Sequence, residues 1–204
     1  MLLKIYPENP ASRHIHFVAE ALNHGHVIIF PTDTVYALGC DLYQSKAFDR
    51  IEKIKGGKKT KADFSVIVNS LSMLSEFTLP IESPIFRILK KNLPGPFTFI
   101  LNANNKVPKL FQSKKKTIGV RIPDNAILKE IIEELGHPLV TTSIHDGDEI
   151  LEYNTDPGLI HEKYSQLTDL VIDGGLGNID ASTIVDCTSG YPEILRQGLG
   201  ILIE

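Results

Sequence analysis

The sequence predicts a single-domain α/β protein built on one twisted sheet of mixed parallel and antiparallel strands, with helices on its faces. Short apolar runs typical of strands alternate with segments whose apolar residues recur at helical spacing. Two strand-like runs, 183–187 and 193–196, lie so close together that antiparallel pairing is open to them. At 204 residues and 42% hydrophobic, the chain can fill one sizeable core, and no repeat or linker divides residues 1–204.

Four helices are indicated by a short polar residue that opens a stripe of apolar residues and by a glycine or proline that closes it. The opening residues are Asn9, Ser45, Ser83 and Asp124. The closing residues, in the same order, are Gly25, Gly56, Pro94 and Gly136. Strands are expected at 27–30, 65–68, 97–101, 117–121, 139–142, 169–172, 183–187 and 193–196.

Composition narrows the class of protein. A net charge of −4 and a pI near 6.0 exclude a uniformly basic nucleic-acid coat, although lysines cluster locally at 53–61 and 114–116. Cys40 and Cys187 lie in apolar surroundings, which favours buried thiols in a reducing cytosol over a disulfide framework. The N-terminus is too short in apolar residues for a signal peptide, and no run approaches the roughly 20 apolar residues that span a bilayer. A cytoplasmic protein without a membrane partner is expected.

The most informative stretch is 30–39. An apolar run ends at Phe30, and Pro31 stops it because proline has no N–H for a sheet ladder. Thr32, Asp33 and Thr34 follow directly. Polar side chains at the end of a buried strand lie where open α/β sheets hold small ligands. An ordinary turn remains the alternative reading of these residues.

The stretch 30–39 also resembles the threonine-containing signature of the YrdC/YciO family, whose members include threonylcarbamoyl-AMP synthases. Further blocks occur in the family's order at 94–98, 118–123, 138–143, 173–175, 182–186 and 194–198. The resemblance covers nearly the whole chain and implies the YrdC-like, or DHBP synthase-like, fold.

The resemblance implies a nucleotidyltransferase linked to the threonylcarbamoyladenosine modification of tRNA. The reaction converts ATP, L-threonine and bicarbonate to threonylcarbamoyl-AMP and pyrophosphate, with Mg²⁺ accompanying ATP. A threonine carbamate and an α-phosphate are both anions, so their reaction requires positive charge and hydrogen-bond donors. Positioning is most of the remaining task. We expect no metal site held by the protein alone, because no cysteine–histidine zinc spacing exists.

Site residues follow from the same resemblance. Lys55 and Ser143 are expected to be catalytic. The substrate-binding residues would be Thr32, Tyr36, Arg121, Thr141 and Thr183. The nucleotide-binding residues would be Lys55, Lys58, Ser143, His145 and Arg196. Three alternatives stay open from the residues themselves: Lys55 as a helix cap, Arg121 in a buried ion pair, and Thr183 as an ordinary strand residue.

Two departures from the synthase pattern are visible. Gly57 occupies the arginine position of the family's Lys-x-Arg motif, which removes a bidentate fork, although Lys58 or Lys59 can still supply charge there. His145 replaces the asparagine of Ser-x-Asn and offers a poorer ligand for Mg²⁺. With both departures, the sequence resembles the YciO branch of the family more than the synthases. The alternative function is therefore a weak or inactive paralogue that binds double-stranded RNA or tRNA through its lysine clusters.

Overall fold

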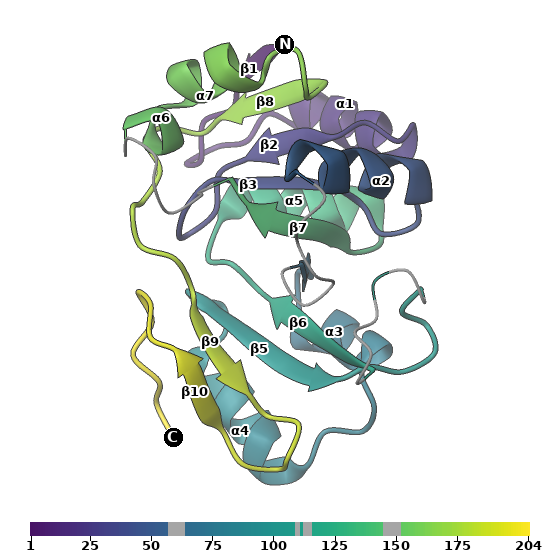
Figure 1. Ribbon diagram of the computed structural model, residues 1–204, viewed down its shortest axis with the longest axis vertical. Coiled ribbons are helices and arrows are strands. Elements are labelled where there is room, and N and C mark those ends of the chain that lie inside the picture. The colour runs from purple at the N-terminus through teal and green to yellow at the C-terminus, as the bar shows by residue number, and fades with distance from the viewer. Residues whose placement is uncertain (57–63, 109–110, 112–115, 145–151) are drawn as a thin grey trace.

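The computed structural model describes residues 1–56, 64–108, 111, 116–144 and 152–204. These residues form one ten-stranded mixed sheet with helices packed on it (Figure 1). The strand order is β1-β8-β2-β3-β7-β4-β6-β5-β9-β10. The α/β fold with a mixed sheet, predicted from the alternation of apolar runs, is confirmed.

The strands are short and mostly buried. Their bounds are β1 Leu2–Lys4, β2 Ile28–Phe30, β3 Ala37–Asp41, β4 Ser65–Ile67, β5 Phe97–Asn102, β6 Thr117–Arg121, β7 Leu139–Ser143, β8 Leu170–Asp173, β9 Thr183–Asp186 and β10 Glu193–Arg196. Four neighbouring pairs are parallel (β1 with β8, β2 with β8, β4 with β6, β5 with β9), and the other pairs of the strand order are antiparallel.

The helices are distributed unevenly over the sheet. They are α1 Ser12–Asn23, α2 Ser45–Ile54, α3 Leu71–Phe77, α4 Ser83–Asn92, α5 Ala126–Leu135, α6 Glu152–Thr155 and α7 Pro157–Tyr164. Figure 1 shows α1, α2, α5, α6 and α7 around the upper strands, and α3 and α4 beside the lower strands β5, β6, β9 and β10. In the strand order, the upper half of the sheet comprises β1, β8, β2, β3 and β7, and the lower half comprises β4, β6, β5, β9 and β10. The two halves meet where β7 pairs with β4.

Alternation along the strands divides the core into two clusters. In β2, Ile29 belongs to the larger cluster, whereas Ile28 and Phe30 belong to the cluster formed with α1 and α5. Successive side chains of a strand point to opposite faces, so a run that is buried on both faces reads as continuously apolar. The run that ends at Phe30 was recognisable in the sequence for this reason.

Several element boundaries differ from the predictions. Asn9 does not cap α1: the helix starts two residues after Pro10, with Ala11 at the N-cap position and no side-chain hydrogen bond there. Asn125 rather than Asp124 caps α5, because its side-chain oxygen accepts from Leu128 N–H at 3.0 Å. Gly136 ends α5 in the left-handed region (φ 79°), as predicted. The strands β1 and β3 and the helices α3, α6 and α7 were not predicted.

The two cysteines lie in buried positions, as their apolar surroundings predicted. Cys40 and Cys187 are both buried and free. The strands β9 and β10 pair antiparallel. Within the described part of the chain, no helix combines the length and the apolarity that crossing a membrane requires.

Candidate ligand-binding groove

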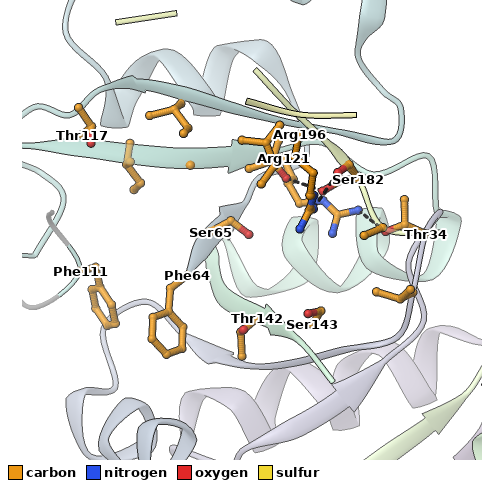
Figure 2. A pocket seen from close by; sticks show the side chains of 17 residues that line it. Thr34, Phe64, Ser65, Phe111, Thr117, Arg121, Thr142, Ser143, Ser182 and Arg196 are labelled. Atoms are coloured by element: carbon orange, nitrogen blue, oxygen red, sulfur yellow. Dashed lines mark hydrogen bonds between the residues drawn. The ribbon is translucent and has the colours of Figure 1, made fainter. Parts of the chain in front are cut away.

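A cavity of about 230 Å³ lies over the lower strands (Figure 2). Its described lining is rich in hydroxyl groups and contains two arginines but no aspartate or glutamate. The lining residues are Thr34, Val35, Phe64, Ser65, Thr98, Ile100, Phe111, Thr117, Ile118, Gly119, Arg121, Thr142, Ser143, Ala181, Ser182, Ile184 and Arg196. Such a surface suits an anionic ligand that accepts hydrogen bonds. We call this cavity the groove.

Strand alternation places the side chains in the groove. In β5, Thr98 and Ile100 line it, whereas Phe97 and Phe99 join the apolar cluster that includes the buried residues of α4. Phe99 pairs with Val120 in the antiparallel register of β5 and β6, so one further step brings Thr98 beside Arg121. A polar residue and a charged residue thus share the face of the lower sheet that α4 leaves uncovered.

Arg121 is held by the turn that follows β2. Its Nη2 atom donates to Asp33 Oδ1 at 2.9 Å and to Thr34 Oγ1 at 2.8 Å. The other oxygen of Asp33 accepts from the backbone N–H of Asp124 at 3.1 Å, which fixes the carboxylate. The polar run after Phe30, together with the charge in β6, therefore forms a buried ion pair at the edge of the groove. The side chains of both partners are less than a tenth exposed.

The ion pair does not satisfy the guanidinium completely. Arg121 Nε is buried and has no hydrogen-bond partner among the described residues. Burial lowers the pKa of Arg121 and nearby Arg196 lowers it further, whereas Asp33 raises it. A charged donor left partly unpaired in a buried place costs free energy, so its retention points to a ligand-binding role.

Arg196 supplies a second positive charge to the same wall. It ends β10, and its Nη2 atom donates to the backbone carbonyl of Ser182 at 2.8 Å. The hydroxyls of Ser182 and Thr98 share a hydrogen bond of 2.8 Å beneath it. Figure 2 shows the guanidinium groups of Arg121 and Arg196 side by side between Ser182 and Thr34. With Asp33, these three charges sum to +1 at one end of the groove.

The opposite end of the groove is aromatic. Figure 2 shows Phe64 and Phe111 at a distance from the arginines. Both rings pack edge-on against Phe48 of α2, with centroid separations of 4.8 and 4.5 Å. Flat apolar surface at one end and positive charge at the other match a ligand that carries an aromatic base and a phosphate group.

Three of the predicted site residues meet in the groove: Arg121, Ser143 and Arg196. Lys55, the residue after α2, directs its Nζ atom to the carbonyl of Ile144 at 3.5 Å, next to Ser143 but outside the lining. Lys58 and His145 lie outside the described residues, as does Gly57.

The threonines and the tyrosine expected to bind substrate are placed beside the groove rather than in its lining. The hydroxyl of Thr32 donates to the Val35 carbonyl at 2.8 Å and accepts from Thr34 N–H at 3.0 Å, which shapes the turn. Tyr36 donates to the Gly175 carbonyl at 2.7 Å, and burial raises the pKa of its phenol. Thr141 lies next to Ser65 in the ladder, and its buried hydroxyl has no partner among the described residues.

Apart from that of Ser143, the hydroxyls that line the groove were missed by sequence reasoning. Thr98, Thr117 and Thr142 lie within strands, where threonine is common for its β propensity alone. Thr34 and Ser182 stand inside the recognised blocks at 30–39 and 182–186. The available signal was period two: Thr98 and Asn102 alternate with apolar residues in 97–102, with Ile100 between them, and Thr117, Gly119 and Arg121 alternate in 117–121.

Mg²⁺ was expected to accompany ATP rather than to occupy a protein cage. The described lining offers hydroxyls and guanidiniums, and within the described chain no three His, Cys, Asp or Glu residues gather into a metal-binding group. Mg²⁺ typically keeps several waters and binds through substrate phosphates. The donor set therefore fits an ion delivered by the nucleotide, and Ser143 is the residue of the predicted set that would offer it an oxygen from the lining.

Comparison with known proteins places the chain in a family. The Sua5/YciO/YrdC family model, described as "Telomere recombination", matches residues 20–198. An uncharacterized protein of Haemophilus influenzae is 39% identical over 96% of this chain and 94% of the relative. A threonylcarbamoyl-AMP synthase of Pyrococcus abyssi is 29% identical over 93% of this chain and 55% of the relative.

Solved structures agree with this assignment. The crystal structure of E. coli YciO superposes with a TM-score of 0.91 at 34% identity, covering 98% of this chain and 97% of that one. P. abyssi Sua5 complexed with L-threonine superposes with a TM-score of 0.86 at 26% identity, and this chain covers 57% of its length. The sequence, the sheet order and these likenesses agree: the chain belongs to the Sua5/YciO/YrdC family.

Proposed function

We propose that the groove binds ATP with Mg²⁺ and transfers its adenylyl group to a carbamate of L-threonine. The observation that carries the proposal is the pair of arginines, Arg121 and Arg196, on one wall of a hydroxyl-rich cavity whose described lining contains no carboxylate. Relatives named threonylcarbamoyl-AMP synthase and the threonine complex of P. abyssi Sua5 supply the chemical class.

The chemistry requires what this wall offers. The threonine amine and bicarbonate give a carbamate with loss of water, and a carbamate oxygen then attacks the α-phosphorus of ATP while the bond to pyrophosphate breaks. Two anions approach each other in this step, so the net positive charge beside Arg121 stabilises the developing charge. Hydroxyls of Thr98, Ser143 and Ser182 can donate to phosphate or carboxylate oxygens, and the rings of Phe64 and Phe111 offer a surface for adenine.

The test is pyrophosphate release from ATP, Mg²⁺ and bicarbonate with and without L-threonine. We expect threonine-dependent release in the wild-type protein and a loss of about 100-fold or more in Arg121→Met, as for the removal of a transition-state donor. Arg50→Met is the matched control, because Arg50 is also paired with an aspartate but lies away from the groove. Wild-type protein that releases no pyrophosphate in response to threonine would contradict the proposal.

The departures at Gly57 and His145 give the proposal a second test. If they limit the rate, Gly57→Arg combined with His145→Asn should raise threonine-dependent release, because the changes restore a bidentate donor and an oxygen ligand. A restored variant no faster than wild type would show that these positions do not control turnover. The alternative of RNA binding stays a prediction, because most of its lysines lie outside the described residues.

A further inference from the structure

The hydroxyl of Thr183, at the start of β9, is hydrogen-bonded to the C-terminal segment. It donates to the Gly200 carbonyl at 2.6 Å and accepts from Gly198 N–H at 2.9 Å and from Gln197 Nε2 at 3.3 Å. A hydroxyl has a single donor position, so the Thr183 hydroxyl has no second hydrogen to donate to a substrate. The side chain is also completely buried.

Gln197 closes the same arrangement from the other side. The two N–H groups of its amide are shared among three acceptors: the carbonyls of Gly200 at 2.7 Å and Gly198 at 2.9 Å, and the more distant Thr183 hydroxyl. Gly198 allows the segment to lie this close, because a Cβ at that position would collide with the backbone of Ala181 and Ser182. We call Thr183, Gln197, Gly198 and Gly200 the latch.

The C-terminal part of the latch begins at Gln197, the residue directly after Arg196. In the pairing of β10 with β9, Ile194 lies opposite Val185 and Arg196 opposite Ile184, so an irregularity separates Arg196 from the regular ladder. Bulges of this kind redirect a side chain and are common beside functional sites. On its far side, the chain is fixed by Thr183, while the Arg196 side chain reaches back to the Ser182 carbonyl. Arg196 is thus held between a bulge and the latch.

We propose that Thr183 is a positioning residue that holds the Arg196 guanidinium at the positively charged end of the groove. The ligand of this inference, ATP, rests on the proposed function. The positions of Thr183 and Arg196 do not depend on it. Without the latch, the exposed strand β10 is held by its ladder with β9 and by the contact of Arg196 with the Ser182 carbonyl, so the backbone that carries the Arg196 side chain is less firmly fixed. The affinity for the ligand then falls, although the ligand itself does not contact Thr183.

The geometry is tested without ligand by the NMR resonance of the Arg196 guanidinium Nε–Hε, assigned by its loss in Arg196→Lys. Thr183→Val removes the hydroxyl at nearly constant volume, and Thr183→Ser keeps it. We expect the resonance to shift or broaden in Thr183→Val and to keep its position in Thr183→Ser. Thr168→Val is the matched control, because the buried hydroxyl of Thr168 also binds a backbone carbonyl, that of Tyr164 at 3.1 Å.

The functional consequence is tested by ATP–Mg²⁺ titration of the same variants. Thr183→Val should weaken binding about 3- to 10-fold, the loss expected for one net hydrogen bond. In an Arg196→Ala background, Thr183→Val should cause no further loss, because both changes act through one guanidinium. Thr168→Val should bind ATP like wild type.

The outcomes separate the two ideas. An Arg196 resonance that stays in place in Thr183→Val overturns the latch, whatever happens to ATP. An equal loss of affinity from Thr183→Val with and without Arg196 also overturns it, since the effect is then general destabilisation. A resonance that moves in a protein whose wild type does not bind ATP refutes the proposed function and leaves the positioning role standing.

Discussion

Two arginine–aspartate pairs in this protein have nearly the same chemistry and opposite surroundings. Arg50 and Asp169 meet near the upper edge of the sheet at 2.7 and 3.2 Å, and both side chains are about a third exposed or more. Arg121 and Asp33 meet beside the groove, and both are less than a tenth exposed. Each aspartate also accepts one backbone N–H, from Val27 or from Asp124.

The difference lies in how completely each guanidinium is used. Arg50 uses both terminal nitrogens on Asp169 and reaches the Leu167 carbonyl as well, an arrangement that serves only to join α2 to β8. Arg121 uses one nitrogen for Asp33 and Thr34, and its buried Nε has no partner among the described residues. A buried pair is weak evidence for stability, because desolvation offsets its attraction. The groove pair is therefore best explained by ligand binding and the outer pair by structure.

The largest expected effect is on stability when the carboxylates are neutralised. Asp33→Asn leaves Arg121 charged and buried without its counterion, which should lower the free energy of unfolding by about 3–5 kcal/mol. Asp169→Asn should cost less than about 1 kcal/mol, because solvent screens Arg50. Urea unfolding of both variants measures the difference. Equal losses of unfolding free energy in the two variants would mean that the two ion pairs contribute equally to stability.

Replacing both partners of the buried pair by apolar side chains should weaken ligand binding while leaving stability nearly unchanged. The double variant Arg121→Met/Asp33→Leu removes both buried charges together. Its free energy of unfolding should stay within about 1 kcal/mol of the wild-type value. ATP binding should nevertheless fall by about 10- to 100-fold, the cost of a charge-assisted hydrogen bond. Thermal melts with and without ATP–Mg²⁺ report both quantities at once. A double variant that ATP still stabilises as it does wild type would remove Arg121 from the ligand site.

The outer pair predicts a pH dependence of stability. Burial alone would raise the pKa of Asp169, but hydrogen bonds from Arg50 and Val27 N–H prevail and lower it below the ordinary 3.8. A depressed folded-state pKa means that the stability from Asp169 is complete above pH 3.8 and is lost as the pH falls through the folded value. Wild type should therefore lose more unfolding free energy between pH 5 and pH 3 than Asp169→Asn does, by less than about 1 kcal/mol because the pair is largely exposed. Parallel acid-induced losses in the two proteins would show that Asp169 titrates as it does in the unfolded chain.

The same contrast explains what the sequence could and could not predict. The run ending at Phe30 and the charge in 117–121 are visible locally, so the strand, the sheet type and Arg121 were found. β3 was missed because its glycine, cysteine and aspartate do not read as a strand, although the pairing with β2 and β7 buries it fully. Whether a hydroxyl faces a ligand or a backbone carbonyl depends on register between distant strands. The sequence therefore could not show that the Thr183 hydroxyl lies against the Gly200 carbonyl or that Thr98 lines the groove.

The smallest predicted effect concerns Thr141, whose hydroxyl is buried without a partner among the described residues. Thr141→Val replaces that hydroxyl by a methyl group, so stability should stay within about 1 kcal/mol of wild type or rise, because an unsatisfied polar group is removed. Thr98→Val is the comparison, since it breaks a hydrogen bond of 2.8 Å to Ser182 and should destabilise by about 1 kcal/mol. Urea unfolding with and without ATP separates the cases. A Thr141→Val protein that is as stable as wild type but is no longer stabilised by ATP would move Thr141 into the ligand site, as the family resemblance implies.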